Sequence, residues 1–296
     1  MKTHHPLLIP LILVAAAMTA CASPAETPQP VFHSTKDVFH DPVLPFEVMS
    51  GSITIAGDVH RAPGSNPHDV MIVIGGSGSH LRSDVAPAIP MFLNDEVAVA
   101  IFDRRGSGSS TGTLQTPGTI NSEWQIPVLA DDVSAVANSL SAMGFERIGV
   151  VGSSMGGWIS IAAAARSDLI DYVVAINGGA SSVAVSDAFD SLTNQGLSID
   201  QAIIQLDGVS LSKSYSPEAD LARIDQPILW IMGELDDSNP TQLDLEVVER
   251  WKQKGKRFQT IVIDGADHNF INVETGEPSL AWLQTVSEFA RIEGRQ

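Results

Sequence analysis

The chain has 296 residues, a length that fits one large domain or two small ones, and 44% of its residues are hydrophobic, which is typical of a globular protein with a sizeable core. Its net charge of −18 at pH 7 argues against nucleic acid as a partner, because phosphate backbones are bound by basic surfaces. The single cysteine, Cys21, excludes a disulfide within the chain.

The N-terminal residues have the pattern of an export signal. Lys2 precedes an apolar run from Leu7 to Ala17 that is too short to span a bilayer, and small residues follow up to Cys21. We therefore predict a signal peptide over residues 1–21. A lone cysteine at its end resembles the lipobox of bacterial lipoproteins, in which the thiol is lipidated. This predicts an exported protein anchored by lipid in the cell envelope; without the anchor it would be periplasmic or secreted.

Residues 22–45 are rich in proline and lack periodicity, which predicts a flexible tether outside the core. From Phe46 onward, short β-branched runs predict strands, and apolar residues at helical spacing predict helices. The predicted strands cover residues 46–50, 52–59, 70–74, 97–102, 148–151, 172–176, 227–232 and 258–263. The predicted helices cover residues 84–92, 127–143, 155–165, 199–206, 242–254 and 278–292.

Strands that alternate with helices predict right-handed crossovers and a mostly parallel sheet. Functional residues in such a sheet lie just beyond the carboxyl ends of the strands. The regular pattern breaks over residues 181–224, an insertion longer than an ordinary loop. We interpret it as a small cap over the site, in which substrate selection would lie. The alternative is an excursion of the chain without that role.

The segment from Gly152 to Gly156 reads G-x-S-x-G, with Ser154 at its centre. A predicted strand precedes it and a predicted helix follows, which is the context of a nucleophile on a sharp turn. Glycines on both sides allow the backbone to pass close by. The alternative is a turn that merely contains small residues. The helix that starts at Met155 offers a free N–H group to a developing negative charge, and the glycine-rich loop after residue 74 offers a second one, from Ser77.

A nucleophilic serine needs a base to take its proton, and the base needs a carboxylate to orient it. His268 follows the last predicted strand, and we predict that it is the base, with His80 as the competitor. Asp236 lies in the loop after the preceding strand, and we predict that it is the carboxylate, with Asp237 as its nearest rival. No cluster of His or Cys supports a metal site, and we expect neither a metal nor a cofactor.

The chain order Ser154, Asp236, His268 is that of the α/β-hydrolases. From about residue 46 to its end, the chain resembles bacterial α/β-hydrolases, and is similar to the small esterases and the serine aminopeptidase-like group. One departure is that its oxyanion loop lacks the His-Gly-Gly opening of many esterases. The motifs that match are Gly75-Gly76-Ser77-Gly78, Asp103-Arg104-Arg105-Gly106-Ser107-Gly108, the segment from Gly152 to Gly156, Gly233-Glu234-Leu235-Asp236 and Asp267-His268.

The resemblance implies an α/β-hydrolase fold, with a mostly parallel central sheet flanked by helices and a small cap insertion, over residues 46–296. It implies a serine hydrolase that cleaves carboxylic esters through an acyl-enzyme. Ser154, His268 and Asp236 would form the triad, and the N–H groups of Ser77 and Met155 the oxyanion hole. The expected substrate is a small acyl ester or a short peptide. The alternatives are a peptidase or amidase, and a non-catalytic envelope lipoprotein that uses the fold for binding.

Overall fold

A computed structural model describes residues 43–78, 80–114, 118, 121–207 and 213–293 of the chain. The predicted signal peptide, the predicted lipidation of Cys21 and nearly all of the predicted tether lie outside these residues. Within the described part, no helix is both long enough and apolar enough to cross a bilayer.

The described residues form an eight-stranded sheet in the order β1-β2-β4-β3-β5-β6-β7-β8. The pairs β1–β2 and β2–β4 are antiparallel, and all other neighbours in the sheet are parallel. The predicted mostly parallel sheet is therefore confirmed. Its strands are β1 (Leu44–Ser50), β2 (Ile53–His60), β3 (Asp69–Ile74), β4 (Val97–Phe102), β5 (Arg147–Ser153), β6 (Tyr172–Ile176), β7 (Ile228–Gly233) and β8 (Phe258–Ile263).

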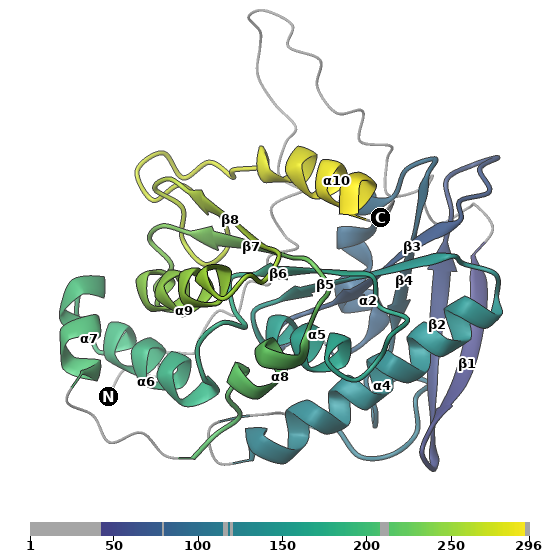
Figure 1. Cartoon of the computed structure of the whole chain (residues 1–296), viewed down its shortest axis with the longest axis horizontal. Helices are drawn as coiled ribbons and strands as arrows, with labels where there is room; N and C mark the ends of the chain where they lie inside the picture. The colour runs from purple at the N-terminus through teal and green to yellow at the C-terminus, as the bar shows by residue number, and fades with distance from the viewer. Residues whose placement is uncertain (1–42, 79, 115–117, 119–120, 208–212, 294–296) are drawn as a thin grey trace, which may run out of the picture.

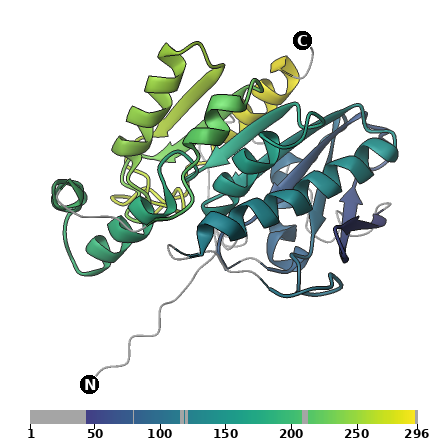
Figure 2. The ribbon, with the colours of Figure 1, turned by 60° about the horizontal axis from the view of Figure 1, so that its bottom comes forward.

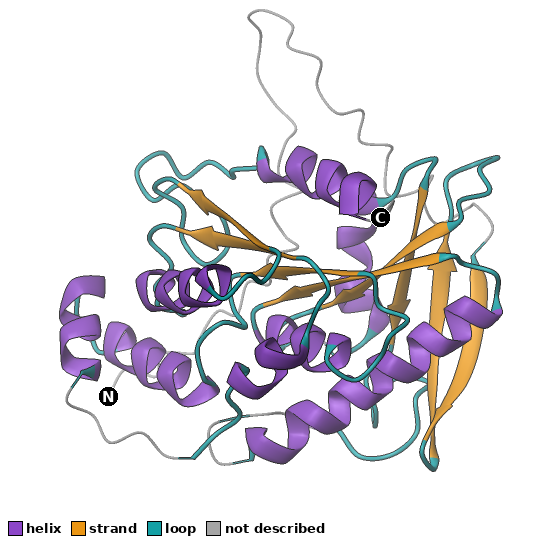
Figure 3. Cartoon of the chain, viewed as in Figure 1, coloured by secondary structure: helices purple, strands orange, loops and turns teal. Residues whose placement is uncertain are grey.

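Helices cover both faces of the sheet, as Figures 1 and 3 show. Each face buries its own apolar cluster, because strands that are buried on both sides carry apolar side chains in both directions. One face is covered by α4 (Ser122–Ala142), α5 (Met155–Ala164), α8 (Glu218–Arg223) and α9 (Thr241–Gln253). The other is covered by α2 (Arg82–Val85), η2 (Ala86–Ala88), α3 (Ile89–Phe92) and α10 (Trp282–Glu293).

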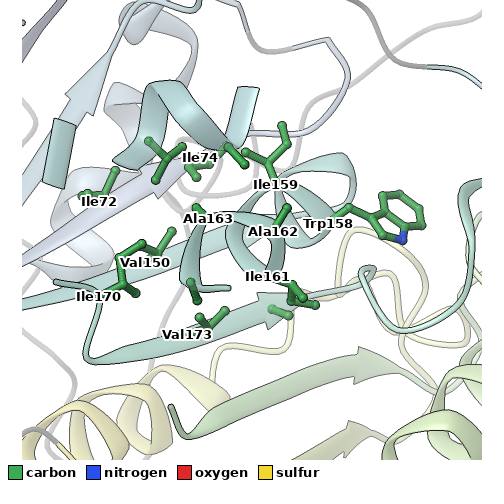
Figure 4. Close-up of a cluster of buried hydrophobic side chains, with 14 of the residues drawn as sticks. Ile72, Ile74, Val150, Trp158, Ile159, Ile161, Ala162, Ala163, Ile170 and Val173 are labelled. Carbon is green, nitrogen blue, oxygen red and sulfur yellow. The ribbon is translucent and has the colours of Figure 1, made fainter. Parts of the chain in front are cut away.

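Helix α5 packs especially close to the sheet. Its small residues Ala162 and Ala163 are fully buried and lie near Val150 and Val173 of the strands (Figure 4). The first residue of this helix directly follows Ser154, so the close packing of the helix also restricts the position of that serine. The helix start is thereby held at a fixed place beyond the end of β5.

The insertion over residues 181–224 contains α6 (Val183–Asn194), α7 (Ile199–Leu206) and α8. In both Figure 1 and Figure 2, α6 and α7 lie at one side of the molecule, near α9. They enclose a small apolar cluster of their own, made by Phe189, Ala202 and Leu206, against which Leu243 of α9 packs.

The predicted strands all appear, but three predicted helices differ in extent. Residues 84–92 form the three short segments α2, η2 and α3, because Pro87 and Pro90 each remove a backbone donor and restrict the preceding residue. Helix α4 starts at Ser122, five residues before Pro127, which lies inside it. The last helix starts at Trp282 and not at residue 278.

Candidate active site

Ser154 lies on the sharp turn between β5 and α5. Its backbone has φ +52° and ψ −119°, a conformation that a non-glycine residue rarely adopts and that costs on the order of 1–3 kcal/mol. A Cβ atom at Gly152 would collide with the carbonyl group of Gly156, and one at Gly156 would lie 2.5 Å from the carbonyl oxygen of Ile74. The turn can therefore form only with glycine at these positions.

The predicted acid and base lie in contact at the ends of β7 and β8. His268 Nδ1 lies 2.8 Å from Asp236 Oδ2. The Asp236 side chain is fully buried, and its other oxygen, Oδ1, accepts hydrogen bonds from the backbone N–H groups of Ser238 and Asn239, both at 2.8 Å. Because these donors stabilise the carboxylate, the His268 ring is held against a fixed negative charge.

This charge sets the protonation of His268. Burial by itself would lower the pKa of the imidazole, but the charge and hydrogen bond of Asp236, together with the charges of Asp237 and Asp267, raise the pKa above 6.5. An acceptor at Nδ1 also favours the tautomer that carries its proton there. The lone pair is then left on Nε2, the nitrogen that a base would use toward a serine hydroxyl.

Ser154 and His268 line the same cavity, which has a volume of about 480 Å³. In the described structure, no hydrogen bond joins Ser154 Oγ to His268 Nε2. Catalytic pairs without bound substrate often lie slightly apart and approach when the substrate binds. Because both side chains line one cavity, a carbonyl group bound there could reach both of them.

Both residues predicted to supply the oxyanion donors lie near the serine. Met155 is the first residue of α5, where a backbone N–H group has no partner within the helix. Ser77 lines the same cavity as Ser154. The loop that carries Ser77 lies directly against the nucleophile, because a Cβ atom on Gly76 would be 3.4 Å from the Cβ atom of Ser154.

The rival residues lie in other environments. Asp237 accepts a hydrogen bond from Thr193 Oγ1 through its backbone oxygen, and burial together with the charge of Asp236 raises the pKa of its carboxyl group. The Nδ1 atom of His80 is buried and has no partner among the described residues. Burial and the nearby charge of Arg104 lower the pKa of His80, and it does not line the cavity.

Arg104, which belongs to the matching motif of residues 103–108, is a buried cation. Its Nη2 atom donates to the carbonyl oxygen of Gly75 and, at 2.9 Å, to that of Gly76. Its side chain is almost fully buried, and burial lowers its pKa to about 10, while Asp84 opposes this shift. Arg104 thereby fixes the glycine-rich loop at the point where the loop touches Ser154.

Two buried asparagines join the loop after β7, which carries Asp236 (the acid loop), to the loop after β8, which carries His268 (the base loop); no local sequence pattern indicates either asparagine. Asn177, at the end of β6, donates from Nδ2 to the His268 carbonyl at 2.7 Å and accepts from the Gly233 N–H at 2.8 Å. Asn239 donates from Nδ2 to the Asn177 carbonyl at 2.9 Å. Its Nδ2 also lies 3.4 Å from His268 Nδ1. These bonds hold the ends of β6, β7 and β8 together.

The insertion over residues 181–224 does not form the wall of this cavity. None of its described residues lines the cavity, contrary to the expectation that substrate selection would lie there. The insertion instead packs on α9, and it touches the acid loop through the bond from Thr193 to Asp237. The described residues also contain no group of three or more His, Cys, Asp or Glu side chains that could hold a metal ion.

Comparison with known proteins identifies related sequences. The model of the prolyl oligopeptidase family matches residues 85–291. RutD of Caulobacter sp. (strain K31), which is named as a carbamate hydrolase, is 31% identical over 124 residues. The match covers 41% of this chain and 41% of that protein, so it spans less than half of the relative.

Solved structures of low sequence identity share the fold. An esterase of Pyrococcus furiosus aligns with a TM-score of 0.63 and 20% identity, over 88% of this chain and 94% of its own. A proline iminopeptidase of Mycobacterium smegmatis aligns with a TM-score of 0.61 and 18% identity, over 85% and 99%. An acylaminoacyl peptidase of Pyrococcus horikoshii aligns with a TM-score of 0.60 and 16% identity, over 86% of this chain and 42% of its own. The fold is that of the α/β-hydrolases.

Proposed function

Because the chain belongs to the prolyl oligopeptidase family, whose fold is that of serine hydrolases, we propose that it hydrolyses carboxylic esters, with Ser154 as the nucleophile. The observation that carries the proposal is the contact of 2.8 Å between His268 Nδ1 and the buried carboxylate of Asp236, beside a cavity that Ser154 and His268 share. A base held in one tautomer next to a strained serine is the arrangement that acyl transfer needs.

In the proposed reaction, Ser154 Oγ forms a bond to the ester carbonyl carbon while its proton passes to His268 Nε2. The carbonyl oxygen becomes negatively charged and accepts hydrogen bonds from the N–H groups of Met155 and Ser77, each worth about 3 kcal/mol. The bond to the alkoxide then breaks, and the alkoxide takes the proton from Nε2. Water next gives a proton to Nε2 and attacks the acyl carbon. The bond from that carbon to Ser154 Oγ breaks, Oγ takes the proton from Nε2, and the acid is released.

The test is hydrolysis of p-nitrophenyl butyrate by the wild-type chain and by Ser154→Ala. Turnover should fall by at least about 10⁴-fold in the variant, because the nucleophile is removed. A fluorophosphonate probe should label the wild-type chain and leave Ser154→Ala unlabelled. The matched control is Ser134→Ala on α4, where the hydroxyl only bonds the Ala130 carbonyl of its own helix. Turnover by Ser154→Ala at the wild-type rate would refute the proposal.

The family and two of the similar structures favour peptide cleavage as a second candidate. The same serine, base and oxyanion donors would act on an amide, and the partial likeness to RutD adds a carbamate carbonyl as a related target. Matched ester, carbamate and aminoacyl p-nitroanilide substrates separate these reactions through the ratio of their kcat/KM values. The third candidate, a binding protein without activity, predicts that the fluorophosphonate probe does not react at all.

A further inference from the structure

The cavity that opens at Ser154 extends into the core on one face of the sheet. Its floor is formed by Val73, Val151 and Ile176, one from each of the neighbouring strands β3, β5 and β6. All three side chains belong to the apolar cluster on the face that α3 and α10 cover. The cavity is therefore a slot between the sheet and these helices, and no described residue of the insertion at residues 181–224 lines it.

The opposite wall of the slot is also apolar. It is formed by side chains of η2, α3 and α10: Pro87, Ala88, Met91, Phe92 and Trp282. The rings of Phe92 and Trp282 are 6.4 Å apart, and both side chains are almost fully buried. A slot whose walls are aliphatic and aromatic stabilises an apolar group that fills it, by roughly fourfold in affinity for each buried methylene.

The charges around the slot favour a substrate that carries no negative charge there. Asp84 and His268 are the ionisable residues among those that line the slot, and no Lys or Arg is included. The Asp84 carboxylate already accepts the backbone N–H groups of His80 and Leu81, at 3.0 and 2.8 Å, and so is held in place. Arg104 interacts with the charge of Asp84, but it donates to two carbonyls of the glycine-rich loop and does not line the slot. A substrate carboxylate would therefore meet Asp84 with no cation in the slot wall to pair with.

We propose that this slot binds the hydrocarbon chain of the acyl group, so that the substrates are neutral esters of medium-chain aliphatic acids, and that Ala88 sets how long a chain fits. This inference rests on the proposed ester hydrolysis. The acyl group stays bonded to Ser154 after the alcohol leaves, so it is the part of the substrate that a slot beside the serine can retain. The alcohol must take a proton from His268, whose side chain is 19% exposed, and must depart into solvent.

The first experiment measures kcat/KM of the wild-type chain on p-nitrophenyl esters from acetate to palmitate. We expect a rise of roughly fourfold per added methylene until the slot is filled, and then a plateau or a fall. The parallel series is a set of alkyl acetates with increasing alcohol length, for which we expect little change. A steeper dependence on the alcohol than on the acyl chain would overturn the assignment of the slot to the acyl group.

The second experiment fills the slot with Ala88→Phe. The half-buried Ala88 side chain lines the slot, so a phenyl ring there should lower turnover of octanoate at least about tenfold more than it lowers turnover of acetate. The matched control is Ile204→Phe, which places the same ring on α7 of the insertion, at a residue that is 75% exposed. Its chain-length profile should match the wild type. Should Ala88→Phe fail to fold, as judged by circular dichroism, Ala88→Leu replaces it with a smaller addition.

Two outcomes would overturn the inference while leaving the proposed function in place. In one, the folded Ala88 variant hydrolyses all chain lengths in the wild-type proportions; in the other, Ile204→Phe changes the chain-length preference. Failure of the proposed function is distinguishable, because the wild-type chain would then hydrolyse none of the esters. In that case 1-octanol tests the slot directly. It should raise the Tm of the wild-type chain and not that of Ala88→Phe, and equal shifts would overturn the slot as well.

Discussion

At the residue scale, the orientation and the protonation of the His268 ring are set by the groups that surround its Nδ1 atom. The fully buried Asp236 carboxylate contacts Nδ1, and the backbone N–H groups of Ser238 and Asn239 hold that carboxylate in turn. The charge and hydrogen bond of Asp236, with smaller contributions from Asp237 and Asp267, raise the pKa of the imidazole despite burial. Neighbouring negative charge therefore sets the protonation of His268, and its neutral form should prevail only above pH 6.5.

Asp236→Asn tests this tuning. We expect kcat/KM for p-nitrophenyl butyrate to fall by about 10³–10⁴-fold, because the amide no longer selects the tautomer with the proton on Nδ1. In the wild type, activity should be lost as pH falls through the raised pKa of His268, so the acidic limb of the pH–rate profile should lie above pH 6.5. In Asp236→Asn this limb should move to lower pH, because the charge that raises the pKa is gone.

The control for this prediction is Asp237→Asn, which removes the neighbouring carboxylate. The bond from Thr193 to Asp237 is made to the backbone oxygen, which the variant keeps. Loss of the Asp237 carboxylate should therefore reduce the rate by less than about tenfold. A larger loss in Asp237→Asn than in Asp236→Asn would transfer the acid role to Asp237. An acidic limb at the same pH in Asp236→Asn and wild type would contradict the electrostatic explanation.

At the scale of elements, the loops after β6, β7 and β8 are held together by Asn177. Its backbone has φ +45°, which asparagine tolerates better than most residues, and its side chain is almost fully buried. Through Nδ2 and Oδ1 it bonds the His268 carbonyl and the Gly233 N–H, which lie in two different loops. The relative position of the acid loop and the base loop therefore depends on a residue that belongs to neither.

Asn177→Asp tests whether Asn177 positions the loop that carries His268 or only stabilises the fold. Aspartate keeps the acceptor for the Gly233 N–H but places an oxygen against the His268 carbonyl, so the base loop should shift. We expect kcat to fall at least about tenfold with KM nearly unchanged, since the substrate slot does not include this residue. A loss expressed only in KM, or only in Tm, would contradict a positioning role.

Asn272→Asp is the matched control in the loop after β8. Asn272 Oδ1 accepts from the N–H groups of Glu274 and Thr275, and aspartate can accept both bonds in the same way. The variant should retain kcat within about twofold and lose little stability.

At the scale of the whole molecule, a buried carboxyl group on α9 joins the insertion to the helices that cover the sheet. Asp244 on α9 is 2% exposed, and its Oδ1 accepts the N–H of Ser181, the first residue of the insertion, at 2.8 Å. Burial raises its pKa to about 7, hydrogen bonds from Ser181 oppose the shift, and the charge of Asp236 adds to it. The folded chain therefore keeps a proton that the unfolded chain loses near pH 4, so this group stabilises the fold less as pH rises from about 4 to 7.

Asp244→Asn should remove this pH dependence. Asparagine still accepts the Ser181 N–H and cannot ionise, so between pH 5 and pH 8 the variant should gain about 2–3 kcal/mol of unfolding free energy relative to wild type. Urea unfolding at the two pH values measures the difference. The control is Asp207→Asn, at an exposed position that follows α7, which should give the same difference from wild type at both pH values. A wild-type chain that loses no stability relative to Asp244→Asn over this range would contradict the prediction.

Much of the fold follows from local patterns in the sequence. Short β-branched runs predict each strand within a few residues, because a strand buried on both faces must be apolar along its length. The pattern G-x-S-x-G predicts the turn at Ser154, because only glycine leaves room for the backbone beside it. The extent of the helices was less predictable, since Pro87 and Pro90 divide what the apolar spacing alone indicates as one helix.

The sequence by itself determined the strand order along the chain, the turn that carries Ser154 and the candidates for acid and base, because each of these leaves a local mark in residue type or spacing. Only the tertiary structure decided that Asn177 bonds the carbonyl of His268, 91 residues away, that Arg104 fixes the glycine-rich loop, and that the cavity lies between the sheet and the helices α3 and α10. Such contacts depend on how distant segments pack against one another, and a polar residue that meets its partner only in the folded chain has no periodicity or neighbouring motif to reveal it.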